Sequence, residues 1–240
     1  MNRDLSDRLC KLCEVTPTCD SLADIGCDHG YVSIELVKTG KAKRVLAMDV
    51  NEGPLERAKE NIASAGLSDV IETRLSDGLH NVENDRLFDT ILIAGMGGRL
   101  IRDILSEGSA KVSKATCLVL QPQSEIFLVR EYVLDAGFVI ESEYCVKDRG
   151  KFYFILICRR SKSKVCEADP FFFEYSRKLL EERDEVYRQY LSKSLEAVAK
   201  YLEQAGDRSD KLKADKENII RALSFYEETD YGKNNCIGNN

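Results

Sequence analysis

The chain has 240 residues, of which 43% are hydrophobic and 15 are glycines, which suffices for one α/β core and a smaller appendage. Its formal net charge of -6 excludes a chain-wide basic field, so a polyanionic partner would need a local basic patch. No apolar run reaches the ~20 residues that span a bilayer, and residues 1–10 alternate charged with apolar side chains, so we expect a cytoplasmic protein with no membrane partner.

Near the start of the chain, Leu5, Leu9, Leu12 and Cys13 recur at helical spacing. Cys10 and Cys13 form a C-x-x-C pair, but no second Cys or His pair follows to complete a zinc site, so we expect no metal. The nine cysteines are an odd number scattered over a chain too large to depend on disulfides, and reduced thiols are therefore expected.

Strand-like apolar runs alternate with helix-like segments between Ser21 and Arg160. Strands separated by helices imply parallel βαβ crossovers and an open sheet covered on both faces. The short charged segment 147–151 between the last two runs suits a hairpin. We therefore predict an α/β fold whose mostly parallel sheet ends in an antiparallel hairpin. The predicted strands are 21–25, 44–50, 70–75, 88–94, 116–121, 138–146 and 152–159, and the predicted helices are 31–39, 54–65, 98–105 and 125–136.

After Arg160 the composition changes to a Ser-Lys-Ser-Lys linker and then to long charged segments with apolar residues at helical spacing. One apolar stripe runs from Phe172 to Val198 and another from Leu212 to Leu223, with a plausible turn at 206–209 between them. The tail 232–240 has no apolar periodicity. The sequence therefore predicts a sheet domain over 1–160 and a helical hairpin or coiled-coil extension over 161–240.

The most informative motif is Asp24-Ile-Gly-Cys-Asp-His-Gly30, which follows a predicted strand and precedes a predicted helix. A glycine-bearing turn there lets backbone approach a ligand in the crevice where open α/β sheets bind ligands. A dinucleotide fingerprint would have a glycine in place of Asp28, whose carboxylate would repel a pyrophosphate. Carboxylates here suit a cofactor with an ammonium and a sulfonium group, as S-adenosylmethionine (SAM) has. A purely structural turn is the alternative for this segment alone.

Later strand ends carry residues that suit the rest of SAM. Asp49 ends the second strand, where an acidic side chain can accept bonds from both ribose hydroxyls. Asp77 follows the third strand and could bind the adenine amine, and the glycines after the fourth strand leave room beside the methyl group. Because these loops share one edge of the sheet, we predict a SAM site there. The predicted cofactor-binding residues are Asp24, Gly26, Asp28, His29, Gly30, Asp49, Val50, Asn51, Ser76, Asp77, Gly78, Ala94, Gly95, Met96 and Gly97.

These motifs closely resemble those of the bacterial TrmK family, the tRNA (adenine-22-N1)-methyltransferases. The form D-x-G-x-D-H-G is more specific than the general methyltransferase loop, because Asp28 and His29 replace the usual small residues. Cys27 stands where the family often has threonine, and this departure touches no proposed role. The resemblance is carried through the sheet domain by DIGCDHGY (24–31), DVNEGPL (49–55), RLSDGL (74–79), AGMGG (94–98), LQP (120–122) and KFY (151–153).

The resemblance implies a Rossmann-like class I methyltransferase that methylates N1 of adenine 22 in the D-arm of bacterial tRNA, with SAM as cofactor and the extension positioning the tRNA. Adenine N1 offers a lone pair, so the protein chiefly has to align N1, the methyl carbon and sulfur. Methylation acidifies the N6 amine, so a carboxylate near N6 could stabilise the transition state or accept a proton. Asp28 is the catalytic candidate, with helix capping or binding of the methionine ammonium as alternatives.

Several nearby residues allow two interpretations. His29 could contact cofactor or base, although a histidine in a tight loop more often bonds backbone. Gln121 could line the base pocket or simply end a strand, and Tyr31 or Tyr153 could stack on a flipped base or belong to the core. Basic side chains could contact tRNA or form solvated faces: Arg8, Lys11, Arg99, Arg102 and Arg130 near the sheet, and Arg177, Lys178, Arg183, Arg188 and Lys193 on the extension.

Two other classes of function stay open at this point. One is a methyltransferase that acts on another RNA base, a small molecule or a protein, because this fold hosts many acceptors. The other is a non-catalytic module whose cofactor loop is a relic, against which the intact Asp24, Gly26, Asp49 and Asp77 argue. The sequence also leaves the oligomeric state open, with a monomer as the default expectation.

Overall fold

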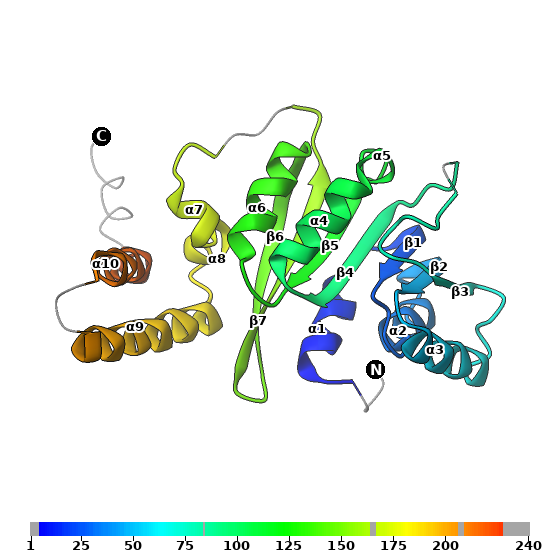
Figure 1. The fold of residues 1–240 in the computed structure, drawn as a ribbon, viewed down its shortest axis with the longest axis horizontal. Coiled ribbons are helices and arrows are strands. Elements are labelled where there is room, and N and C mark those ends of the chain that lie inside the picture. The colour runs from blue at the N-terminus through cyan, green and yellow to red at the C-terminus, as the bar shows by residue number, and fades with distance from the viewer. Residues whose placement is uncertain (1–4, 84, 164–166, 206–208, 228–240) are drawn as a thin grey trace, which may run out of the picture. The chain divides into compact units, whose positions relative to one another are not determined.

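Seven strands form one sheet in the first of the two units into which the chain divides, Met1–Glu174 and Tyr175–Asn240 (Figure 1). The computed structural model describes residues 5–83, 85–163, 167–205 and 209–227. The strands lie in the order β3-β2-β1-β4-β5-β7-β6, and the predicted parallel sheet with an antiparallel end is confirmed. The strands are β1 Cys19–Ile25, β2 Ala42–Asp49, β3 Ile71–Leu75, β4 Thr90–Met96, β5 Cys117–Pro122, β6 Phe138–Asp148 and β7 Lys151–Arg160.

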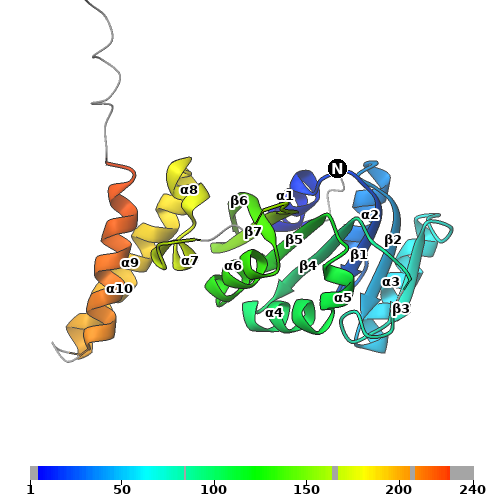
Figure 2. The same cartoon turned by 90° about the horizontal axis from the view of Figure 1, so that it is seen from above.

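Helices cover both faces of this sheet, as Figure 2 shows from a second direction. Helices α1, α2 and α3 contribute Leu12, Leu36 and Ile62 to a core that also takes Leu92 and Val119 from the central strands. Helices α4 and α6 pack against one another over the opposite face. The helices of this unit are α1 Asp7–Val15, α2 Tyr31–Lys38, α3 Glu52–Ser64, α4 Gly98–Glu107, α5 Ser109–Val112, α6 Ile126–Asp135 and α7 Phe171–Glu174.

The order of the strands determines where a ligand can bind. The chain runs outward from β1 to β2 and β3, then returns to place β4 on the other side of β1. In open α/β sheets a crevice forms outside the carboxyl ends of the strands at such a reversal. The Asp24 motif ends β1 and the Ala94 motif ends β4, so the sequence brings its most distinctive loops to this point.

Arg130 is buried inside the first unit, so both interpretations that the sequence allowed for it, a tRNA contact and a solvated face, are wrong. Its side chain is 2% exposed, and its Nε donates to Glu143 Oε1 on β6 at 3.0 Å. Its Nη1 donates to the carbonyls of Phe173 and Glu174 at 2.7 and 2.9 Å. These bonds hold α7 against α6, so the first unit continues to Glu174, beyond the predicted boundary at residue 160.

The second unit contains the predicted helix pair, α9 Glu185–Ala205 and α10 Asp210–Ser224, preceded by the short helix α8 Arg177–Glu181. Leu180, Tyr187 and Leu191 are buried within it, and the Tyr226 hydroxyl donates to the carbonyl of Asp184 at 2.9 Å. The predicted turn lies outside the described residues except at Ser209, which caps α10, and the tail 232–240 lies wholly outside them. Within the described part of the chain, no helix is long and apolar enough to cross a membrane.

Candidate active site

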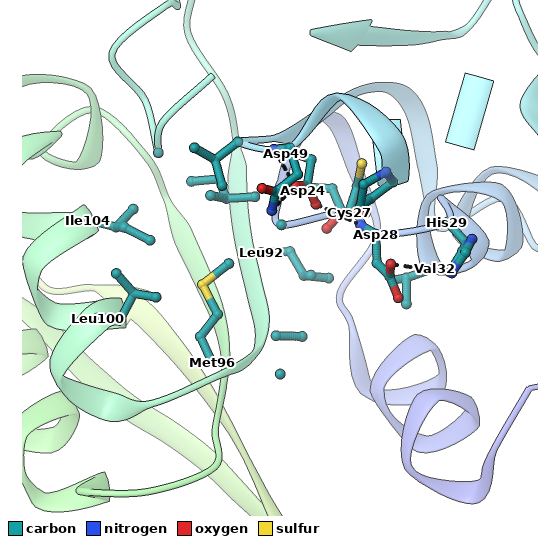
Figure 3. A pocket seen from close by; sticks show the side chains of 18 of the residues that line it. Asp24, Cys27, Asp28, His29, Val32, Asp49, Leu92, Met96, Leu100 and Ile104 are labelled. Atoms are coloured by element: carbon teal, nitrogen blue, oxygen red, sulfur yellow. Dashed lines mark hydrogen bonds and ion pairs between the residues drawn. The ribbon is translucent and has the colours of Figure 1, made fainter. Parts of the chain in front are cut away.

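A cavity of about 460 Å³ opens at the carboxyl ends of β1, β2, β3 and β4. Pockets that bury a cofactor-sized ligand have volumes of this order. Figure 3 shows Asp24, Asp28 and Asp49 on one side of the cavity, with Met96, Leu100 and Ile104 across from them. Every predicted cofactor-binding residue lines the cavity except Gly30 and Gly97, which are the N-cap residues of α2 and α4.

Asp24 is the most deeply buried carboxylate in the cavity, with 2% of its surface exposed. Its Oδ2 accepts a hydrogen bond from the Ser33 hydroxyl at 2.6 Å. Burial raises the pKa of Asp24 from its ordinary value to about 6, the Ser33 bond lowers it, and the charge of Asp49 raises it. At neutral pH the carboxylate is therefore ionised but poorly solvated, so a cationic ligand group beside it would be stabilised.

Asp49 connects the ends of β1 and β2. Its Oδ2 accepts the backbone N–H of Asp28 at 3.2 Å, and its Oδ1 accepts the backbone N–H of Asn51 at 2.9 Å. Nδ2 of Asn51 donates a longer bond to Oδ1 at 3.4 Å, so these contacts fix the carboxylate at the edge of the cavity and Oδ2 keeps a second lone pair for a ligand hydroxyl. This orientation suits the bonds to ribose hydroxyls that the sequence predicts for Asp49.

The turn after β1 depends on Gly26, whose φ is +75°. A Cβ at this position would lie 2.1 Å from Cε of Met96, so a larger residue would displace the Met96 side chain from the cavity. The N–H groups of Gly26 and Cys27 both donate to the carbonyl of Met48 at 2.8 Å. Burial, followed by the charge of Asp24, raises the pKa of the Cys27 thiol, which favours the protonated thiol over a thiolate nucleophile.

Asp28 and His29 lie at the mouth of the cavity. The Asp28 side chain is 71% exposed, with its Oδ1 3.5 Å from Nε2 of His29. The N-cap position of α2 is occupied by Gly30, so helix capping does not explain Asp28. The His29 ring stacks on the Tyr31 ring, with 5.7 Å between their centroids. The backbone of His29 is held separately, because its carbonyl accepts a hydrogen bond from Nδ2 of Asn61 at 3.0 Å.

The loops after β3 and β4 complete the lining. The Ser76 hydroxyl donates to the carbonyl of Gly78 at 2.9 Å and accepts the N–H of Asn81, so it shapes the turn that presents Asp77. The pairing of β4 with β5 is irregular around Gly95, whose φ is +80°. Such a bulge re-aims side chains at the end of a strand, and its neighbours Ala94 and Met96 both face the cavity.

Sequence reasoning missed the lining residues that come from helices. Leu100 and Ile104 lie one turn apart on α4, a helical spacing directly after the glycine motif that could have indicated them. Arg8 of α1, for which the sequence allows a tRNA contact or a solvated face, lines the cavity. Tyr31 also lines it, whereas Tyr153 packs under the Arg8 guanidinium. Among the described residues, no cluster of three or more His, Cys, Asp or Glu side chains could hold a metal ion.

Known proteins share this sequence pattern. The family model TrmK, tRNA (adenine(22)-N(1))-methyltransferase, matches residues 22–228. The tRNA (adenine(22)-N(1))-methyltransferase of Bacillus subtilis is 35% identical over 153 residues, which make up 64% of this chain and 64% of that protein. The chain therefore matches less than two thirds of the length of the first curated relatives.

Solved structures extend the similarity to nearly whole chains. A candidate tRNA (m1A22) methyltransferase of Streptococcus pneumoniae, in complex with SAM, has a TM-score of 0.82 and 33% identity over 91% of this chain and 99% of that chain. The B. subtilis m1A22 tRNA methyltransferase TrmK has a TM-score of 0.78 and 27% identity over 95% of this chain and 99% of its own. From the matched residues and the shared fold, this chain belongs to the TrmK family of tRNA (adenine(22)-N(1))-methyltransferases.

Proposed function

We propose that this protein transfers the methyl group of SAM to N1 of adenine 22 in tRNA. The observation that carries the proposal is the gathering of Asp24, Asp28, Asp49 and Asp77 from separate strand ends into one cavity, in a chain of this family. Carboxylates suit the ribose hydroxyls, the adenine amine and the two cationic groups of SAM better than they suit a pyrophosphate. The cytoplasmic location and the monomeric state stay predictions.

The proposed placement of SAM follows the strand ends. Asp49 accepts the ribose hydroxyls, and Asp77 accepts the adenine amine from the turn after β3. Asp24 provides buried negative charge beside the methionine ammonium. The methyl group then faces the loop at Gly95, where the absent side chain leaves room for the incoming base.

Methyl transfer to adenine N1 depends more on the alignment of the two substrates than on a strong base. Adenine N1 attacks the methyl carbon with its own lone pair while the carbon–sulfur bond breaks, so cofactor and base must be held in line. Because the ring becomes cationic, an exposed carboxylate such as that of Asp28 can stabilise the N6 amine as its acidity rises. An unstacked adenine could reach this carboxylate from the solvent side of the cavity.

Incubating the protein with SAM and tRNA and measuring the nucleosides by mass spectrometry tests the activity. We expect 1-methyladenosine with the wild type. With Asp49→Ala, loss of the charge-assisted ribose bonds should weaken SAM binding by about 1.5–3 kcal/mol. The control is Asp20→Ala, which removes an exposed carboxylate paired with Lys43. Calorimetry showing wild-type SAM affinity in Asp49→Ala would refute the cofactor placement. Detection of a different methylated nucleoside would show that adenine N1 is not the target.

The second unit is proposed to position the tRNA, because every described residue that lines the cavity belongs to the first unit. Truncation after Glu174 should leave SAM affinity within about threefold of wild type while lowering kcat/KM for tRNA at least about tenfold. Truncation after Arg160 is the comparison, since it also removes the Phe173 and Glu174 carbonyls that bind Arg130 and should lower thermal stability. Full tRNA methylation by the chain ending at Glu174 would assign the second unit another role.

A further inference from the structure

Arg8 is a cation in the cavity that two uncharged groups hold in place. Its Nη1 donates to Oε1 of Gln121, and its guanidinium lies over the ring of Tyr153, 5.2 Å from the centroid. Among the residues that the structure describes, no carboxylate forms an ion pair with Arg8. A Cβ placed on Gly95 would lie 3.8 Å from its Nη1, so the guanidinium is beside the bulge of β4. Within the described part of the chain, the positive charge of Arg8 is therefore held in position without a carboxylate paired to it.

Gln121 has an unusual environment for a polar side chain. It is fully buried on β5, next to Ala94 of β4, and its Nε2 has no hydrogen-bond partner among the described residues. A buried amide without a partner destabilises a fold, whereas an apolar residue of similar shape at the same place would not. The one bond that Gln121 is seen to make through its side chain is the bond to Arg8. Because the buried amide of Gln121 destabilises the fold, its presence here points to a functional role.

The charges around the cavity indicate what Arg8 binds. Arg8 is the sole arginine or lysine among the described residues that line the cavity, which it shares with the carboxylates of Asp24, Asp28, Asp49 and Asp77. A guanidinium whose partners are a neutral amide and an aromatic ring keeps donors for a ligand with anionic oxygens. Carboxylate and phosphate oxygens are the groups that arginine binds best.

We propose that Gln121 is a positioning residue that holds Arg8 in the cavity so that Arg8 binds the anionic oxygens of a ligand. This inference rests on the proposed function, which supplies two such groups: the carboxylate of SAM and a phosphate of the tRNA. Gln121 acts only through Arg8, because it does not itself line the cavity. The buried amide oxygen limits the rotation of the arginine side chain, so that less entropy is lost when the ligand binds.

Gln121→Met tests the inference, because methionine keeps the length of the side chain without its hydrogen-bonding groups. We expect an unchanged or higher Tm, since the buried unpaired amide is gone, together with weaker ligand binding by at least about tenfold. Calorimetry with SAM alone shows whether the affected group is the SAM carboxylate, and a direct tRNA binding assay shows whether it is a phosphate. The double variant Arg8→Met/Gln121→Met should bind no more weakly than Arg8→Met.

The control is Thr90→Val, which removes a buried hydroxyl at the end of β4 away from the cavity and should leave both affinities unchanged. If Gln121→Met keeps both affinities within about twofold of wild type, the inference is wrong. A lowered Tm with losses that add to those of Arg8→Met would make Gln121 a structural residue and would also overturn it. Neither result bears on the proposed function, which fails separately if the wild-type protein does not methylate tRNA.

Discussion

Replacing Arg130 by methionine is expected to lower the free energy of unfolding of the first unit by about 3–5 kcal/mol. Arg130 and Glu143 are each 2% exposed, so Arg130→Met leaves the Glu143 carboxylate buried without the arginine. The carbonyls of Phe173 and Glu174 also lose the donor that holds α7. Breaking one side of a buried ion pair costs more than the pair contributes, because the remaining charge stays desolvated. Urea unfolding followed by circular dichroism measures the loss.

An exposed ion pair in the hairpin of β6 and β7, which also carries Glu143, provides the control. Arg159 on β7 binds Glu141 on β6 at 3.1 Å, with both side chains partly in water. Arg159→Met should therefore cost at most about 1 kcal/mol. The double variant Arg130→Met/Glu143→Met should recover part of the loss, because two apolar side chains can fill the space of a buried ion pair. A loss for Arg130→Met as small as that for Arg159→Met would contradict the structural role of Arg130.

The sheet was predictable because its strands are apolar runs that glycines and polar turns interrupt. Differences at the strand ends come from contacts distant in sequence. The strand predicted at 88–94 begins at Thr90, and the chain bends at Asp89, whose carboxylate accepts the N–H of Ser21 at 2.9 Å. The same strand continues to Met96, because pairing with β5 resumes after Gly95. Neither contact leaves a local signal in the sequence.

The strand-end part of the cavity was predictable from a topological rule, since loops that follow parallel strands meet at one edge of the sheet. The residues that helices contribute to the cavity were not predictable in this way. Arg8 reaches Gln121 across 113 positions of sequence, and only the packing of α1 on the sheet brings them together. The burial of Arg130 was not predictable, because arginine is usually solvated and its partner Glu143 lies on β6, beyond any helical spacing.

Asp28→Asn is expected to lower the single-turnover rate of tRNA methylation by roughly 10²–10⁴-fold, the range for a lost general base or comparable electrostatic stabilisation. Asp28 is ionisable, exposed and at the mouth of the cavity, where an incoming base would arrive. Asparagine is the suitable substitute because the φ of Asp28 is +50°, a left-handed conformation that asparagine adopts more readily than alanine. The amide keeps the shape of the carboxylate but can neither accept a proton nor balance the cationic ring.

Titrating SAM separates the two roles that Asp28 can have. If its carboxylate acts on adenine N6, the rate stays low at saturating SAM, because the missing charge affects the transition state and not cofactor binding. If it binds the methionine ammonium, the defect is in SAM affinity, and the rate returns to near wild type when SAM is saturating. Asp20→Asn controls for loss of an exposed carboxylate, because Asp20 lies near the opposite end of β1 and pairs with Lys43. Recovery of Asp28→Asn at saturation would therefore exclude the catalytic role and leave Asp28 as a cofactor ligand.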